Sequence, residues 1–484
     1  MKTTRTRFAP SPTGFMHIGN LRTALYCYLY ARRHKGIFIL RIEDTDQERF
    51  VPGATEIIYQ TLQECGMTHE EGPDTGGKYG PYVQSQRKDI YLRYAKRLVQ
   101  LGGAYYCFCS KERLETLAEE QSGANGEKTY KKYDKHCLHL PKEEIKRRLA
   151  AGEPYVIRQN IPLSGTSSYT DLVFGEISVD FSDIEDNILI KSDGLPTYNF
   201  ANVVDDHLMK ISHVFRGSEY LSSTPKYNLI YDTFKWERPQ YIHLPLIMRD
   251  AQHKLSKRHG DANFDDFIKK GYLPEAIVNY IALLGWSPGD NREKLSFAEL
   301  IAAFDIAGIS KSGSIFDEPK LRWLNAQYLK ELSPEEFNRR AIPFYEQSKV
   351  KNKYDYAKLS ALLQSRAEIL SDIPDAVDFL EEFGDFDNAL YLNQKQKVDA
   401  AVAKAALTAL IPAVEAISDW SLTTIHDSVS AFAETSGFKK GQLLWSARIA
   451  VTGRASTPGG AFEMFDLLGK PETLRRLKYS LERL

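Results

Sequence analysis

The sequence lacks the features that would place this chain in a membrane or hold it together by disulfide bonds. No apolar run approaches the roughly 20 residues of a membrane-spanning helix, and the first residues contain no apolar secretory segment. Cysteine is scarce, with five in 484 residues. An odd, low count without a secretion signal argues against a disulfide framework. We therefore expect a cytoplasmic protein with no membrane partner.

Net charge is also nearly absent. The chain has 63 lysines and arginines against 64 aspartates and glutamates, a formal net charge of -1. This balance excludes a uniformly basic nucleic-acid-binding protein, so an RNA ligand would need local basic faces, such as those at 86–97 and 142–148. The length predicts about three domains, and we find no internal repeat or low-complexity tract.

The N-terminal segment predicts alternating strands and helices. Residues 5–9 and 37–42 are short, rich in β-formers and bounded by turn residues, whereas residues 21–33 carry leucines at helical spacing. This order indicates a βαβ unit with parallel strands. The loop after the first strand then lies at the carboxyl edge of the sheet, where open α/β sheets bind ligands.

A change of character at residue 105 predicts an inserted domain. It contains strand candidates near 154–161 and 186–191, and the α/β pattern resumes at Tyr198, with a further strand expected at 241–248. Beyond about residue 330, apolar residues recur at helical spacing. The predicted divisions are 1–104 and 198–260 as two halves of a Rossmann-like domain, 105–197 as the insertion, 261–330 as a further domain, and a helical region 331–484 split near 390.

Two motifs far apart in the chain supply the groups that a nucleoside triphosphate needs. They are Pro10-Ser11-Pro12-Thr13-Gly14-Phe15-Met16-His17-Ile18-Gly19-Asn20 and Lys254-Leu255-Ser256-Lys257-Arg258. Gly14 and Gly19 allow close backbone approach, and His17 and Asn20 lie three apart at the start of a helix, so both can face one ligand. Cations in the second motif would stabilise the charge that develops on the phosphates in the transition state.

In this order the two motifs resemble the signatures of class I aminoacyl-tRNA synthetases. Further blocks at 41–46, 196–207 and 215–220 are similar, almost residue for residue, to those of glutamyl-tRNA synthetases. Asn20 stands where many class I signatures have a second histidine. Because an amide cannot carry charge, we expect the cationic role to fall on His17 and the lysines.

The resemblance implies a role for each matching residue. Catalysis falls to His17, Asn20, Lys254 and Lys257, and ATP binding to Ser11, Gly19, Glu219, Leu255 and Lys257. The glutamate residues are Arg7 and Arg216 for the γ-carboxylate, with Tyr198 and Asn202, and Glu43 for the α-ammonium. Arginine suits a carboxylate because its fork binds both oxygens. Glutamine would leave buried arginines unpaired, which disfavours it.

A pair of short cysteine motifs predicts a structural zinc site. Cys107-Phe108-Cys109 and Cys137-Leu138-His139 offer four N and S ligands in two close pairs, which suits tetrahedral zinc. Tyr133 and His136 are alternatives to His139 as the fourth ligand. The pattern resembles a zinc site in the acceptor-binding domain of some glutamyl-tRNA synthetases.

The resemblance covers nearly the whole chain and implies its reaction and partners. It implies a monomeric glutamate–tRNA ligase that uses MgATP to form glutamyl-adenylate and then esterifies tRNA(Glu), with tRNA(Gln) as a second candidate. Residues 105–197 would bind the acceptor stem and 261–330 would contact the stem. The helical C-terminal region resembles an anticodon-binding cage, in which Gln364 and Arg366 match positions near the anticodon.

Four competing interpretations predict other features. A glutaminyl-tRNA synthetase should have C-terminal β-barrels, and the truncated paralogue that modifies queuosine in tRNA lacks the anticodon domain that residues 331–484 provide here. A small-cofactor nucleotidylyltransferase shares the signature loop but needs no long helical tail. A non-catalytic RNA-binding regulator should have lost His17, Lys254 or Lys257, which are all present.

Overall fold

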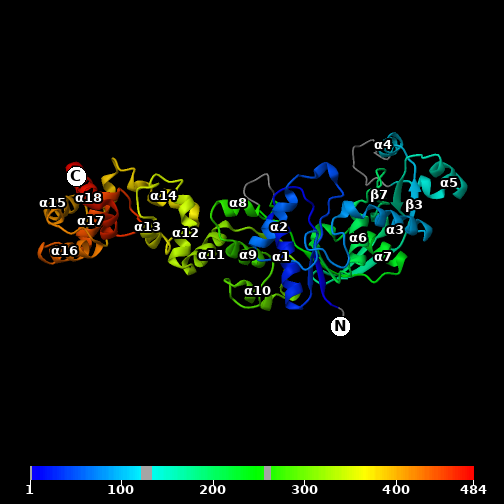
Figure 1. Ribbon diagram of the computed structural model, residues 1–484, viewed down its shortest axis with the longest axis horizontal. Coiled ribbons are helices and arrows are strands. Elements are labelled where there is room, and N and C mark those ends of the chain that lie inside the picture. Colours follow the sequence, from blue (N-terminus) through cyan, green and yellow to red (C-terminus); the bar gives the residue numbers. More distant parts are fainter. Residues whose placement is uncertain (1–2, 121–132, 256–262) are drawn as a thin grey trace. The chain divides into compact units, whose positions relative to one another are not determined.

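The computed structural model describes residues 3–120, 133–255 and 263–484 (Figure 1). It divides into two compact units. The first contains Met1–Phe267 and Ile277–Asp317, and the second contains Ile268–Ala276 and Glu318–Leu484. No helix among the described residues is both long and apolar enough to cross a bilayer.

The first unit is built on a parallel sheet. Strand β1 (Arg5–Phe8) pairs with β2 (Ile37–Leu40), and β8 (His213–Gly217) pairs with β9 (Gln240–Leu244), both in parallel. Strand β1 lies beside β8, where Ser212 N donates to Arg5 O. The carboxyl ends of these strands therefore meet at one edge of the sheet, as predicted for ligand binding.

Helix α1 (Ile18–Arg33) makes the connection between β1 and β2. Its leucines Leu21, Leu25 and Leu29 are at most 1% exposed, because it packs on both strands. His17 forms its N-cap, and Arg32 and Arg33 lie in its last turn, where cations favour the helix dipole. The predicted βαβ unit is thus present, and it fixes His17 at the functional edge.

A second sheet lies largely within the predicted insertion. Strands β3 (Ala104–Cys107), β4 (Val156–Gln159) and β7 (Ile188–Ile190) pair antiparallel. A hairpin of β5 (Thr166–Asp171) and β6 (Gly175–Asp180) instead joins the first sheet, because Asp171 pairs with Tyr241 of β9. The helices of residues 54–234 are α2 (Ala54–Glu64), α3 (Lys88–Gln100), α4 (Lys111–Glu120), α5 (Lys142–Ala150), α6 (Tyr198–Leu208) and α7 (Thr224–Phe234).

One strand prediction needs correction. Residues 241–248 do not form a single strand, because β9 ends at Leu244 and a two-residue strand, β10 (Ile247–Met248), pairs with β11 (Ser314–Ile315). Pro245 has no N–H to continue a ladder, so the strand stops there. The chain can then turn toward Lys254.

The remaining helices include those of the second unit. They are α8 (Phe264–Lys269), α9 (Pro274–Leu283), α10 (Phe297–Ala303), α11 (Glu318–Glu331), α12 (Pro334–Tyr345), α13 (Tyr356–Leu363), α14 (Ile373–Val377), α15 (Ala400–Glu415), α16 (Leu422–Thr435), α17 (Lys440–Thr452) and α18 (Ala461–Arg483). The last four pack together around buried Leu407, Leu443 and Leu477 (Figure 1). Helix α18 is kinked at Gly469, which has φ 75°.

Candidate active site

A cleft of about 430 Å³ opens at the carboxyl edge of the parallel sheet. Residues from both predicted sets line it. The nucleotide set contributes Ser11, His17, Gly19, Asn20, Glu219 and Lys254. The glutamate set contributes Arg7, Glu43, Tyr198 and Arg216. Leu255 and Asn202 are buried outside this lining. The Asn202 amide instead donates to Tyr198 O.

The segments that flank the lysine motif bring it beside the histidine motif. Lys254 forms a β-bridge with Met248, while His17 forms one with Asn263. Phe264 N also donates to Met16 O. Predicted residue Lys257 lies outside the described residues. After the motif the chain therefore returns to the start of α1 at Asn263 and Phe264, and Lys254 lines the same cleft as His17, although more than 200 residues separate the two motifs in sequence.

His17 presents its ring in a defined tautomer. Its Nδ1 accepts a hydrogen bond from Gly19 N at 3.0 Å. An acceptor nitrogen carries no proton, so the proton of the neutral ring lies on Nε2, the nitrogen that can donate to a phosphate oxygen. A second proton on Nδ1 would face the Gly19 N–H. His17 can therefore donate a hydrogen bond from Nε2 to a ligand in the cleft.

A cation that the sequence reasoning missed lies nearby. Arg22 lines the cleft from α1, and its guanidinium donates to Leu284 O and Pro245 O. Burial lowers the pKa of Arg22, and Tyr26 and Glu219 oppose this only in part. Its position three residues after Gly19 places both on one helix face. That spacing could have identified it from sequence.

At the other end of the cleft, Arg7 and Glu43 belong to a buried ion-pair network. Arg7 Nε donates to Asp206 Oδ1 at 3.0 Å, and Arg41 Nη1 donates to the same oxygen at 2.8 Å. Arg41 Nη2 also donates to Glu43 Oε1 at 2.8 Å. Burial alone would raise the pKa of Asp206, but the two arginines hold it below its usual value.

The network is closed by a second aspartate. Arg87 Nε donates to Asp205 Oδ1 at 2.7 Å, and Arg41 Nε lies 3.7 Å from Asp205 Oδ2. The side chains of all three are at most 1% exposed. The network therefore balances three cations with three anions: Arg7, Arg41 and Arg87 with Glu43, Asp205 and Asp206.

Glu43 keeps one oxygen for a ligand. The hydrogen bonds that it accepts from Arg41 and Gln84 both go to Oε1, so Oε2 accepts no hydrogen bond from the described residues. Burial raises the pKa of Glu43, although the charge of Arg41 opposes this. A ligand cation beside Oε2 would favour the ionised form.

Arg216 differs from Arg7, which pairs with Asp206 in the same cleft. It is 6% exposed and contacts no carboxylate among the described residues. Its Nε donates to His243 Nε2 at 3.1 Å and its Nη2 to Thr224 Oγ1 at 2.6 Å. No hydrogen bond to a described residue uses Nη1. The guanidinium is therefore a buried cation with one end left for an anion.

Aromatic rings stabilise this cation. The Arg216 guanidinium carbon lies 5.5 Å from the ring centre of Tyr220, 4.7 Å from that of Tyr227 and 5.3 Å from that of Tyr241. Ring faces attract a desolvated cation. The rings cannot replace a carboxylate, so the positive charge of Arg216 stays uncompensated and would attract an anion that enters the cleft.

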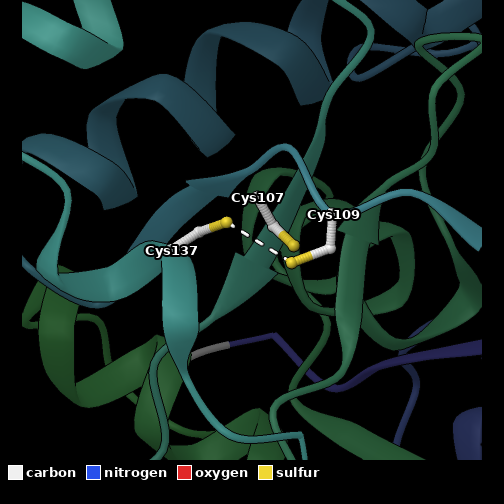
Figure 2. A group of neighbouring side chains, drawn as sticks. All are labelled: Cys107, Cys109 and Cys137. Carbon is white, nitrogen blue, oxygen red and sulfur yellow. Dashed lines mark hydrogen bonds between the residues drawn. The ribbon is translucent and has the colours of Figure 1, made fainter. Parts of the chain in front are cut away.

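The three predicted cysteine ligands come together in the insertion. Figure 2 shows the thiols of Cys107, Cys109 and Cys137 converging, and the three sulfur atoms lie within 4.8 Å of one another. Tyr133 Oη lies 3.3 Å from Cys107 Sγ and 3.2 Å from Cys109 Sγ. His139 is exposed and lies outside this group. The donor set fits a metal ion with Tyr133 as the fourth group.

The environment of Cys107 favours its charged form. Contacts with the Cys137 thiol, the Tyr133 hydroxyl and the Arg158 guanidinium outweigh burial and lower the pKa of Cys107. The thiolate is the form of cysteine that binds metals.

The two predicted anticodon residues have different surroundings in the second unit. Gln364 uses its amide N–H groups to donate to Leu329 O and Leu332 O. Arg366 is exposed, donates to Thr457 O and lines a cavity of about 250 Å³ that also includes Arg454. Arg366 can therefore meet a ligand, whereas Gln364 holds α11 and α13 together.

Comparison with known proteins identifies the family. A family model described as "tRNA synthetases class I (E and Q), catalytic domain" matches residues 3–323, and an "Anticodon binding domain" model matches residues 336–481. The glutamate–tRNA ligase of Clostridium kluyveri is 55% identical over 484 residues, which are 100% of this chain and 99% of the relative. The chain belongs to the glutamate–tRNA ligase family.

Other matches agree with this membership. The glutamate–tRNA ligase of Clostridium botulinum strain Eklund 17B is 56% identical over 99% of both chains. A crystal structure of glutamate-tRNA synthetase from Elizabethkingia anophelis superposes with a TM-score of 0.90 at 35% identity, over 99% of this chain and 100% of the other. The predicted architecture, a class I catalytic domain with a parallel sheet followed by a helical anticodon-binding region, is confirmed.

The buried network predicts an asymmetry between two aspartates. Asp205→Ala removes the partner of Arg87 and leaves a buried charge, so it should lower the free energy of unfolding by about 3–5 kcal/mol. Asp232→Ala removes an exposed pair with Arg238 and should cost less than about 1 kcal/mol. Urea unfolding followed by circular dichroism measures both. Equal losses would contradict the balance of charges described above.

Proposed function

We propose that this protein activates L-glutamate with MgATP to give glutamyl-adenylate and diphosphate, and then transfers the glutamyl group to the 3′-terminal ribose of tRNA(Glu), releasing AMP. The observation that carries the proposal is Arg216, a buried cation without a carboxylate partner. It faces the same cleft as His17 and Lys254. An anionic amino-acid side chain and a triphosphate would thus meet in one site.

Glutamate would bind at the Arg216 end of the cleft. The γ-carboxylate would accept from Arg216 Nη1, with Arg7 and Tyr198 beside it, and the α-ammonium would donate to Glu43 Oε2. Asp206 already compensates the charge of Arg7, so Arg216 supplies most of the attraction. Asn202 would act by holding the first turn of α6, through its bond to Tyr198 O.

This charge arrangement also accounts for selection against glutamine. A neutral amide would desolvate Arg216 without compensating its charge, and only one of its two terminal atoms, the oxygen, could accept a hydrogen bond. Sites built to pair a buried polar group reject analogues that leave it unpaired by large factors, on the order of 10⁴. The pocket therefore selects for charge more than for shape.

ATP would bind at the start of α1. Gly19 lets the phosphates approach the helix N-terminus, His17 Nε2 and the Asn20 amide would donate to phosphate oxygens, and Ser11, Glu219 and the backbone near Leu255 would line the nucleotide pocket. Mg²⁺ enters with the nucleotide and neutralises part of its charge. Lys254 and Lys257 would stabilise the negative charge on the α-phosphoryl oxygens and the departing diphosphate.

The reaction would then proceed in two displacements. The glutamate α-carboxylate attacks the α-phosphorus, the bond to the β-phosphate oxygen breaks, and diphosphate leaves. A hydroxyl of the terminal ribose next attacks the activated carbonyl carbon, and AMP leaves. Arg216 and Glu43 would hold the glutamate at both ends so that its carboxylate faces the phosphorus.

Binding of tRNA would extend over the rest of the chain. Residues 105–197 would bind the acceptor stem, 261–330 would contact the stem, and 331–484, with subdomains divided near 390, would read the anticodon through the cavity that Arg366 lines. We take tRNA(Glu) as the substrate and tRNA(Gln) as the second candidate. We further propose a cytoplasmic monomer.

Aminoacylation tests the function directly. The purified protein, ATP and labelled glutamate are incubated with tRNA(Glu) or with tRNA(Gln), and acid-precipitable label is counted. We expect charging of tRNA(Glu), and charging of tRNA(Gln) would mark the broader substrate range. Failure to charge either tRNA would refute the proposal.

The lysine motif gives a kinetic prediction. Lys254→Ala, and equally Lys257→Ala, should lower the rate of adenylate formation by about 10²–10³, because each removes a cation that acts mainly in the transition state. The exposed Lys395 is the matched control, and Lys395→Ala should keep the wild-type rate. ATP–diphosphate exchange with tRNA present measures the step. Wild-type exchange in the motif variants would remove the lysines from the mechanism.

We also propose that Cys107, Cys109 and Cys137 hold a structural zinc ion, with the Tyr133 hydroxyl as the fourth ligand in place of His139. Bound zinc would cross-link β3 to the segment before α5, and thus support the insertion. It lies outside the glutamate and nucleotide cleft, so its effect on the reaction would be indirect.

Metal analysis tests this site. The wild type should contain about one zinc per chain, Cys109→Ala should lose it, and Cys65→Ala, which removes a buried thiol elsewhere, should keep it. Tyr133→Phe should lower zinc affinity, whereas His139→Ala should not. Zinc-free wild type, or full zinc in Cys109→Ala, would exclude the site.

A further inference from the structure

Three strands bring a buried hydrogen-bonded chain to Arg216. Asp171 ends β5, His243 lies in β9, and Arg216 lies in β8, so the three residues come from neighbouring strands of one sheet. Asp171 Oδ2 lies 2.6 Å from His243 Nδ1, and His243 Nε2 lies 3.1 Å from Arg216 Nε. The glutamate mechanism above makes no use of Asp171 or His243.

The carboxylate fixes the tautomer of the imidazole. Asp171 Oδ1 accepts from Val173 N and Phe174 N, and Oδ2 accepts from His243 N as well as from Nδ1. Because an ionised carboxylate can only accept hydrogen bonds, His243 Nδ1 must carry the proton. Nε2 then has a lone pair that points at Arg216, and it can accept the Nε–H.

Burial preserves this arrangement. The side chains of His243 and Asp171 are 0% exposed, so solvent does not offer an alternative partner. Burial and the charge of Arg216 lower the pKa of His243, although Asp171 opposes this. The ring therefore stays neutral and remains an acceptor.

The hydrogen bonds to His243 and Thr224 also determine where the Arg216 guanidinium points. His243 Nε2 accepts the hydrogen bond from Arg216 Nε, and Thr224 Oγ1 accepts the one from Nη2. Thr224 Oγ1 itself donates to Tyr220 O. With two corners of a planar group fixed, the third corner, Nη1, has one direction available. A rotated guanidinium would keep its charge but lose its alignment with a carboxylate.

We propose that Asp171 and His243 are positioning residues, which orient Arg216 toward the side-chain carboxylate of glutamate and so help to set the amino-acid specificity. This inference rests on the proposed function, because it takes Arg216 as the glutamate receptor. It assigns part of that specificity to a strand that belongs to the insertion, Thr166–Asp171, which meets the catalytic sheet at Asp171.

Two substitutions of His243 separate positioning from folding. Glutamine places an amide oxygen near the position of Nε2, whereas asparagine reaches only the position of Nδ1. His243→Asn should therefore raise the KM for glutamate in aminoacylation by roughly ten- to hundredfold, the value of a hydrogen bond to a charged group. His243→Gln should restore most of this loss, and neither should change the KM for ATP.

Asp171→Asn provides a second test with the imidazole intact. An amide nitrogen at the Oδ2 position would donate to His243 Nδ1 and move the ring proton to Nε2, where it would face the Arg216 N–H. The KM for glutamate should again rise by roughly tenfold or more, and the discrimination between glutamate and glutamine in kcat/KM should fall. The KM for ATP should stay unchanged.

Arg216→Ala separates failure of this inference from failure of the proposed function. If Arg216→Ala raises the KM for glutamate but His243→Asn and Asp171→Asn do not, the positioning role is wrong and the receptor role stands. If Arg216→Ala leaves that KM unchanged, Arg216 is not the receptor and both fail. Equal losses in His243→Asn and His243→Gln, or a parallel rise in the KM for ATP, would also overturn the inference.

Discussion

A buried guanidinium without a carboxylate partner is the constraint on which this site depends. Taking a charge out of water costs several kcal/mol unless another charge compensates it. The chain provides that compensation for Arg7 through Asp206 and for Arg87 through Asp205, whereas Arg22 donates only to backbone carbonyls. At Arg216 it provides tyrosine rings, a neutral imidazole and a hydroxyl. The compensating anion has to be the ligand.

The same reasoning explains why the site needs so much of the fold. Arg216 must stay buried and aligned without a carboxylate partner, and residues of three strands contribute to this. Strand β8 carries it, β9 supplies the acceptor in His243, and β5 supplies the carboxylate that fixes the acceptor. At the other end of the cleft, α1 positions His17 through a cap that also sets its tautomer. A parallel sheet gathers these elements at one edge.

Local patterns in the sequence were sufficient to predict much of this. The βαβ unit follows from leucine spacing and short β-rich runs, and both are found in α1, β1 and β2. The helical C-terminal region follows from apolar periodicity. The histidine and lysine motifs, which resemble those of class I synthetases, line one cleft through His17 and Lys254. In each case the signal lies within a few neighbouring residues.

Choices of partner across the fold could not be predicted in this way. Nothing local shows that Asp206 compensates Arg7 or that Asp205 compensates Arg87, because 199 and 118 residues separate these partners in sequence. The fourth group near the cysteines is Tyr133 rather than His139, because the fold and not the spacing decides which side chain approaches the thiols. Pro245 is an exception, since its missing N–H could have predicted the end of β9.

The most direct measurement of the central claim is a crystal structure of this protein with L-glutamate bound. The account predicts that an oxygen of the side-chain carboxylate lies within hydrogen-bond distance of Arg216 Nη1, with His243 still accepting from Nε. Glutamate bound with its side-chain carboxylate on another cation, and with Arg216 Nη1 unpaired, would contradict it.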